Sequence, residues 1–110
     1  MKLASLKNKS DFDLIFEKNS LKISSGEFDV LLVFKNKKEI NYGFIFPKKN
    51  IHLAVNRNFA KRSAKEMLKT LSPKKGFDIV FFVRKKIVNF DKDKVKKNFA
   101  ELKRKIEFCF

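Results

Sequence analysis

A row of basic side chains at helical spacing is the part of this sequence best suited to bind a charged ligand. Arg57, Lys61 and Lys65 follow one another at intervals of four residues, which places them on one face of a helix. Like charges at this spacing cost roughly 0.2–0.5 kcal/mol per pair, and no acid follows Arg57 before Glu66. Phosphate groups would relieve the repulsion and release condensed counterions. The row therefore favours a nucleic-acid-binding surface over a solvated helix face, which would usually mix both signs.

Three neighbouring residues broaden this candidate surface. Asn58, Arg62 and Lys69 lie beside the row, away from the apolar side of the same helix. The guanidinium of Arg offers planar contacts with several donors, and Asn can bond a sugar or a base edge. We therefore expect these side chains to share the ligand with the basic row.

Side chains for enzymatic catalysis are not gathered in this way. The carboxylate pairs at residues 11–13 and 91–93 both stand at predicted helix starts, where capping is their simplest role. His52 is the one histidine, and we expect it to be solvated or packed in the core. Cys109 is the one cysteine, and we interpret it as a small hydrophobic residue. No nucleophile, base and oxyanion donor come together, so we expect the side chains to bind rather than to catalyse.

Aromatic residues form a second candidate binding feature. Tyr42, Phe44 and Phe46 alternate along a predicted strand and so share one of its faces. Phe12 and Phe16 lie one turn apart on the first predicted helix. Aromatic residues at these spacings are usually core, but a chain with 14 Phe leaves some rings exposed. Rings beside lysines suit single-stranded nucleic acid by stacking, so a groove flanked by both sets is the alternative to core packing.

The overall composition agrees with a polyanionic partner. The chain has 110 residues, with 27 Lys and Arg against 12 Asp and Glu and a formal net charge of +15. Such an excess repels itself in the folded state and is typical of proteins that bind polyanions. The single Cys excludes an intramolecular disulfide, and the sequence has neither a membrane-length apolar run nor a secretory signal. We expect one cytoplasmic domain over residues 1–110.

Hydrophobic periodicity and turn signals predict the elements that position these residues. They are a helix over 10–18, strands over 27–35 and 41–47, a helix from about 51 to the turn at 72–76, a strand over 77–85 and a last helix that starts at Asp91 or Asp93. The short polar connection between the first two strands suggests an antiparallel hairpin. The long helix between the second and third strands predicts a parallel pair joined by a crossover. The predicted fold is α+β, a small α/β sandwich of order α-β-β-α-β-α with a mixed sheet.

The core sides of the two long helices follow from the same periodicity. The predicted buried residues are Ala60, Ala64, Met67, Leu68 and Leu71 on the first of them, and Val95, Phe99, Leu102 and Ile106 on the second.

Residues 47–66, "PKKNIHLAVNRNFAKRSAKE", resemble the signature of the bacterial ribonuclease P protein subunit. In that family a Lys-Lys pair after a strand is followed by an Ala and then by the motif Arg-Asn-Arg-x-Lys-Arg-x-x-Arg-Glu. The matching residues are Lys48, Lys49, Ala54, Arg57, Asn58, Lys61, Arg62 and Glu66. Lys65 replaces an Arg, and Phe59 stands where the motif has its second Arg. "DFDLIFEKN" and "GFDIVFFVRK" also resemble family segments, so the resemblance covers nearly the whole chain.

The resemblance implies a cytoplasmic partner of a catalytic RNA, in a ribonucleoprotein that removes the 5′ leader of precursor tRNA. The RNA would position the magnesium ions and carry the cleavage, with no catalytic side chain and no organic cofactor. The implied partners are that RNA and precursor tRNA, without a membrane or an obligate protein partner. A left-handed βαβ crossover is also implied, against the general packing rule.

The resemblance assigns residues to two roles. Contacts to the catalytic RNA are implied for Lys48, Lys49, Arg57, Asn58, Lys61, Arg62 and Lys65. A groove for the single-stranded leader, between the sheet and the first helix, is implied to be lined or supported by Phe12, Phe16, Tyr42, Phe44 and Phe46. For Phe59 we consider three roles: stacking on a base, packing on a neighbouring loop, or marking a lost Arg contact.

Three other kinds of protein remain as alternatives. A generic RNA-binding or ribosome-associated protein shares the charge and differs only in its partner. A stand-alone endonuclease needs convergent carboxylates for its metal ions, which isolated pairs at helix starts do not provide. A structural or protein-interaction domain leaves the charge of +15 unexplained.

Overall fold

The computed structural model describes residues 2–6, 9–17, 21–71, 73 and 75–109. The elements, in chain order, are β1 (Lys2–Ser5), α1 (Lys9–Glu17), β2 (Leu21–Ser25), β3 (Phe28–Phe34), β4 (Glu39–Ile45), α2 (Ala54–Lys69), β5 (Phe77–Val83) and α3 (Lys92–Phe108). The predicted α+β class and all six predicted elements are confirmed, with bounds shifted by a few residues.

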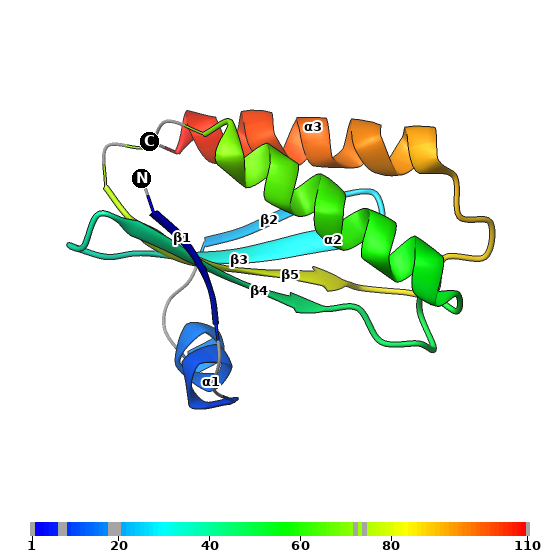
Figure 1. Cartoon of the computed structure of the whole chain (residues 1–110), viewed down its shortest axis with the longest axis horizontal. Coiled ribbons are helices and arrows are strands. Elements are labelled where there is room, and N and C mark those ends of the chain that lie inside the picture. Colours follow the sequence, from blue (N-terminus) through cyan, green and yellow to red (C-terminus); the bar gives the residue numbers. More distant parts are fainter. Residues whose placement is uncertain (1, 7–8, 18–20, 72, 74, 110) are drawn as a thin grey trace.

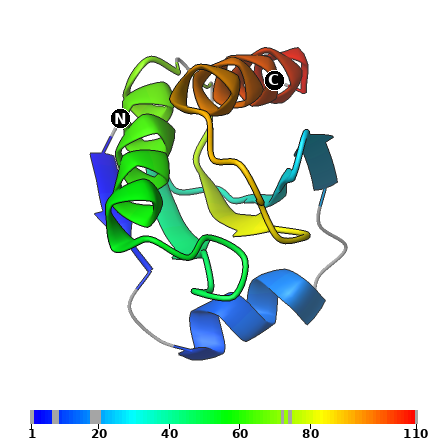
Figure 2. The same ribbon diagram turned by 90° about the vertical axis from the view of Figure 1, so that its right-hand side faces the viewer.

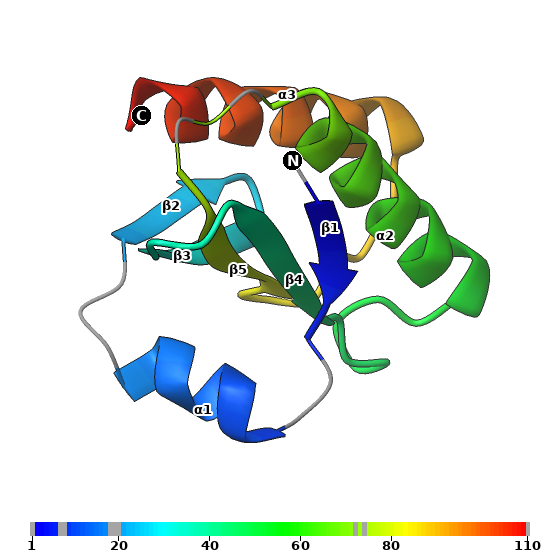
Figure 3. The same cartoon turned by 60° about the vertical axis from the view of Figure 1, so that its left-hand side comes forward.

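The elements form three layers around one mixed sheet. The strand order in the sheet is β1-β4-β5-β3-β2. Helices α2 and α3 cover one face of this sheet, and α1 lies alone against the other face (Figures 1 and 3). The main core fills the space between the sheet and the helix pair, so any ligand must use the outer surfaces or the edges.

The predicted hairpin between β3 and β4 is wrong, because β5 lies between these two strands. β5 pairs with β3 in the antiparallel sense and with β4 in the parallel sense. Its near-continuous apolar sequence suits this central place, where a strand is covered on both faces, and Ile79, Val80 and Phe81 are fully buried. The chain enters β5 through Gly76, where the absence of a side chain is required. A Cβ at Gly76 would lie only 1.9 Å from the carbonyl oxygen of Lys37.

The crossover from β4 through α2 to β5 is left-handed. The two strands are adjacent and parallel, with Tyr42 opposite Ile79, as predicted for the pair that flanks the long helix. Figure 2 looks along these strands: the chain comes forward in β4, returns through α2 above the sheet, and comes forward again in β5 to the right of β4. About 98% of such connections are right-handed. The hand implied by the family resemblance is therefore confirmed against the general rule.

The buried faces of the two long helices are those that the periodicity predicted. Both predicted sets of residues are buried, from Ala60 to Leu71 and from Val95 to Ile106. Ala60 and Ala64 have no exposed surface, and their small side chains let α2 approach the sheet closely. None of the described helices has the length and apolarity to span a membrane.

Strands β1 and β2 are the elements that the sequence prediction missed. Both are short and lie at the two edges of the sheet, where polar residues are tolerated because one backbone edge faces outward. The sequences "KLAS" and "LKISS" contain few strongly β-forming residues. Among the described residues, β1 pairs only with the first part of β4, from Glu39 to Tyr42.

Candidate nucleic-acid interface

The basic row on α2 begins with an arginine that is tied to the loop before the helix. The Nη1 group of Arg57 donates hydrogen bonds of 2.9 Å to the carbonyl oxygens of Ile51 and His52. This side chain is half-buried. Arg57 therefore fixes the entry into α2 as well as bringing positive charge to the surface, a double role that the spacing did not predict.

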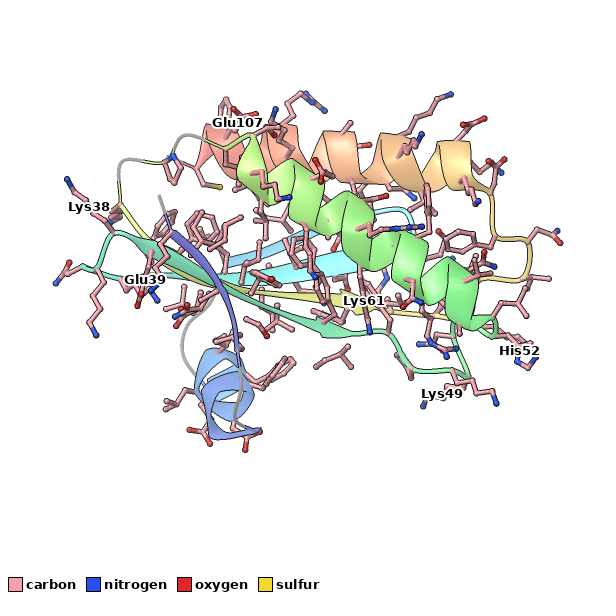
Figure 4. All side chains as sticks on the ribbon, in the orientation of Figure 1. Lys38, Glu39, Lys49, His52, Lys61 and Glu107 are labelled. Atoms are coloured by element: carbon pink, nitrogen blue, oxygen red, sulfur yellow. The ribbon has the colours of Figure 1, made fainter. Side chains whose placement is uncertain are left out.

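Lys61 and Lys65 continue the row towards the edge of the sheet where β1 ends and β4 continues. Figure 4 shows Lys61 extending from α2 towards that strand. The Nζ of Lys65 lies 5.8 Å from the centroid of the Tyr42 ring, within the range of a cation–π contact. Within the described part of the chain, neither lysine forms an ion pair with an acid. Both charges thus remain available to an anionic ligand.

A hollow at this edge, which we call the edge notch, brings cations and aromatic rings together. Its volume is about 340 Å³, and its lining comprises Ser5, Leu6, Phe12, Tyr42, Gly43, Phe44, Lys61 and Lys65. The lining comes from β1 and the residue after it, α1, β4 and α2. A space of this size suits a nucleotide, with apolar rings for a base and ammonium groups for its phosphate.

The edge notch exists because β1 is shorter than β4. The pairing of the two strands ends with Ser5 opposite Tyr42, and the Leu6 N–H donates to the Tyr42 carbonyl at 2.8 Å. Backbone groups along a strand alternate between its two edges, so Phe44 directs its N–H and C=O to the same edge as Tyr42. Among the described residues the β1 pairing ends at Tyr42, and Phe44, two residues further along β4, lines the notch.

The absence of a side chain at Gly43 lets α1 close the notch from the other face of the sheet. A Cβ at Gly43 would lie 2.4 Å from Cζ and 2.5 Å from Cε1 of Phe12. The Phe12 ring therefore occupies the space above this glycine. Tyr42 and Phe44 pack against the core on the helix-pair side, and their rings lie 5.6 Å apart.

The structure brings some of the aromatic residues of the predicted groove together and places the others elsewhere. Phe12, Tyr42 and Phe44 do meet at the edge notch, but Phe46 does not line it. Phe46 is only 7% exposed, and its ring contacts those of Phe28 and Phe44 within the core. Phe16 is 49% exposed on α1, with its ring 6.3 Å from that of Phe82. The alternation along β4 correctly predicted that Tyr42, Phe44 and Phe46 share one face of the strand. It did not show that this face is the one covered by α2 and α3.

The other predicted RNA-binding residues lie on exposed surface around α2. Lys48 and Lys49 are exposed in the turn between β4 and α2, and Figure 4 shows Lys49 there. Asn58 and Arg62 are exposed on α2 itself. Phe59 is half-buried, and its ring packs edge-on against Phe90 at 6.1 Å. Packing on a neighbouring loop is therefore the contact that Phe59 makes in this structure.

A buried ion-pair cluster on β3 was not predicted. Asp29 is fully buried, and its Oδ1 accepts a hydrogen bond of 2.8 Å from Nη1 of Arg84. Nζ of Lys22 lies 3.8 Å from the second carboxylate oxygen, which accepts no hydrogen bond from the described residues. An acid inside a predicted strand was the available signal, because a buried charge needs a partner.

Two partnered acids have pKa values below their ordinary range. A hydrogen bond from Lys35, together with the charge of that lysine, lowers the pKa of Glu39. Lys105 lowers the pKa of Glu101 in the same way, and the Ser25 hydroxyl adds a smaller effect. Neither acid lines the edge notch, so their charges do not neutralise its two lysines.

The candidate catalytic residues occupy capping and surface positions. Asp91 caps α3, where its Oδ1 accepts hydrogen bonds from the N–H groups of Asp93 and Lys94 at 2.9 and 3.4 Å; the side chain of Asp11 lies outside the described residues. His52 is exposed. Cys109 is also exposed, with its thiol donating to the Lys105 carbonyl. Among the described residues, no cluster of His, Cys, Asp or Glu could hold a metal ion.

The fold and the notch define a class: a small α+β protein with the surface of a nucleic-acid-binding protein. The family model described as Ribonuclease P matches residues 1–107. This chain therefore belongs to the ribonuclease P protein family. The ribonuclease P protein component of Marinobacter nauticus is 31% identical over 93 residues, which cover 84% of this chain and 70% of that protein.

Solved structures agree with the family and the fold. The RNase P protein from Thermotoga maritima is similar with a TM-score of 0.71 and 30% identity, covering 94% of this chain and 97% of that one. The RNase P protein of Staphylococcus aureus has a TM-score of 0.70 over 93% of both chains. Its identity is 22%, so this second likeness supports the fold alone.

Proposed function

We propose that this chain is the protein subunit of ribonuclease P and takes part in maturing the 5′ end of tRNA. In this proposal the single cytoplasmic domain binds the catalytic RNA and the leader of precursor tRNA, and it assists the endonucleolytic removal of that leader. The support is its membership of the ribonuclease P protein family and the names of its relatives, which are ribonuclease P protein components.

The observation that carries the binding mechanism is the edge notch. Tyr42 and Phe44 offer ring surface beside two lysines without acidic partners in the described structure, and Phe12 of α1 completes the lining from the other face of the sheet. A leader nucleotide would stack its base on these rings and place its phosphate near Lys61 and Lys65. This proposal thus gives both lysines to the leader, whereas the family resemblance implied contacts to the catalytic RNA. Backbone groups at the Phe44 edge could bond its sugar or base without reading one sequence. Such tolerance suits a substrate pool of many precursor tRNAs.

We assign the catalytic RNA to the exposed outer surface of α2 and the turn before it. Asn58, Arg62, Lys48 and Lys49 lie there, and Arg57 holds that turn against the helix. Phosphate contacts of this kind position the two partners on each other. We propose that the magnesium ions belong mainly to the RNA, which carries the cleavage, while the protein contributes binding and orientation.

Reconstitution tests this function directly. Precursor tRNA is incubated at low magnesium with the protein alone, with the ribonuclease P RNA of the same genome alone, and with both. We expect rapid cleavage at the mature 5′ end only for the combination, because neither partner supplies both the chemistry and the leader contacts. Cleavage by the protein alone would favour a nuclease. RNA binding without any stimulation of cleavage would leave a generic RNA-binding protein.

A further inference from the structure

Two lysines of α3 meet over an aromatic ring of α2. The Nζ atoms of Lys92 and Lys96 lie 5.3 and 5.9 Å from the centroid of the Phe59 ring. Phe59 is itself held by Phe90, in the segment that leads into α3. Both lysines are exposed, and neither forms an ion pair with a described acid. Two like charges therefore share one half-buried ring.

The placement of charge along α3 is unfavourable for the isolated helix. Its first two turns carry Lys92, Lys94, Lys96 and Lys97, against Asp93 within them and the capping Asp91 just before them. The N-terminal end of a helix has a partial positive charge, so lysines there are destabilising, and Lys92 and Lys96 also repel each other at a spacing of four residues. By contrast, Lys105 near the other end is paired with Glu101 at 3.1 Å. A bound anion would remove the cost at the first two turns.

We infer that the RNA-binding surface continues from α2 across Phe59 onto the start of α3, where Lys92 and Lys96 bind phosphates of the catalytic RNA. This inference rests on the proposed function, since it names a further contact of the same partner. Arg62 lies three residues after Phe59 on α2 and so neighbours the ring on the helix surface. The ring thus connects the exposed α2 cations with the two α3 lysines. A single cation over an exposed ring gains about 0.5–1 kcal/mol, but the second must share the ring at the cost of repulsion.

A double variant with a matched control tests the added contact. Lys92→Ala combined with Lys96→Ala removes both charges. Lys37→Ala combined with Lys38→Ala removes two exposed charges from the β3–β4 loop, at the opposite end of the molecule from the start of α2 (Figure 4). Each variant and the unmodified protein is titrated with the ribonuclease P RNA of the same genome over a series of salt concentrations. Thermal melting checks folding, and Ala in the first turns of α3 should not lower the melting temperature.

We expect the α3 variant to bind the RNA about tenfold more weakly and to lower the slope of log affinity against log salt by about two. The control should change the slope by less than about 0.5, because its lysines would not face the RNA. Equal slopes for the two variants would overturn the inference while leaving the proposed function intact, provided that the unmodified protein stimulates cleavage. Failure of the unmodified protein to bind or stimulate would instead overturn the proposed function and this inference with it.

Discussion

At the scale of single residues, the edge notch depends on a glycine that meets an aromatic ring. Gly43 belongs to a strand, where glycine is otherwise unfavourable because it has no side chain to pack. Here the space of the missing side chain is taken by Phe12, whose ring atoms would lie within about 2.5 Å of an added Cβ. The same contact joins α1 to the strand that carries Tyr42 and Phe44, so the pair decides the shape of the notch.

Replacing Gly43 by Ala should therefore impair leader binding selectively. The added methyl group would push the Phe12 ring aside, and base stacking on an aromatic ring is worth roughly 1–3 kcal/mol per base. We expect reconstituted ribonuclease P with Gly43→Ala to bind precursor tRNA at least about fivefold more weakly, measured by titration of labelled substrate. Mature tRNA, which lacks the leader, is the control and should bind as before. An equal loss for both RNAs, or no loss for precursor tRNA, would contradict a leader site at the notch.

The site residues divide into those that the sequence could predict and those that it could not. Arg62 and Lys65 were predictable because helical periodicity separates the exposed side of α2 from Ala60 and Ala64. The burial of Phe46 was not predictable, because alternation along a strand defines two faces but does not show which of them the helix pair covers. The structural role of Arg57 was also hidden, since its hydrogen bonds reach backbone carbonyls that no side-chain pattern reveals.

At the scale of elements, the insertion of β5 between β3 and β4 is the main departure from the sequence prediction. Consecutive strands are neighbours about two-thirds of the time, and nothing in the β3–β4 connection shows that a later strand enters between them. The near-continuous apolar sequence of β5 is typical of a central strand, and the long helix α2 correctly predicted that β4 and β5 are parallel. The missed strands β1 and β2 are edge strands, whose identity depends on neighbours already in place.

Lys35 links the three central strands β3, β4 and β5 at one end of the sheet. Nζ of Lys35, just after β3, lies 2.7 Å from Oδ1 of Asp78 in β5 and 3.3 Å from Oε1 of Glu39 in β4. The hydrogen bond and charge of Lys35 lower the pKa of Glu39 from its ordinary value of 4.5. Because the folded pKa is the lower one, this pairing stabilises the fold fully above the ordinary pKa. The stabilisation is lost as the pH falls through the lowered value.

Removing the lysine should weaken this pH dependence, because Lys35 is the largest cause of the lowered pKa of Glu39. In Lys35→Met the Glu39 carboxylate loses its principal donor and charge partner, so we expect its pKa to rise towards 4.5. A titration of the Glu39 side-chain carbon by NMR measures this change. Lys38→Met removes a nearby exposed charge that forms no ion pair with the described acids, and it should leave the titration almost unchanged. The same Glu39 curve in Lys35→Met and the unmodified protein would show that Lys35 is not the cause.

At the scale of the whole molecule, the charge of +15 is distributed over a small body. Its principal extents are 39 × 27 × 22 Å, so many of its charges lie within a few screening lengths, about 10 Å each at 0.1 M salt. Repulsion among them weakens the folded state. The unpaired lysines of the notch and of α3 contribute to that repulsion, and these are the same charges that the proposed RNA partner would neutralise.

Salt should consequently act in opposite directions on stability and on RNA binding. Raising KCl from about 20 to 500 mM screens the repulsion, and each 1 kcal/mol of relief corresponds to roughly 4–8 °C in a domain of this size. We expect the melting temperature of the free protein to rise by several degrees over this range, while the affinity for the ribonuclease P RNA falls steeply because counterion release becomes less favourable. Calorimetry and binding titrations in the same buffers give both curves.

The RNA itself, added at low salt, should raise the melting temperature as KCl does, since it binds the folded state and neutralises the same charges. A melting temperature that falls or stays constant with KCl would mean that the charges are already compensated within the fold, and the excess of lysine would then need another explanation than a polyanionic partner.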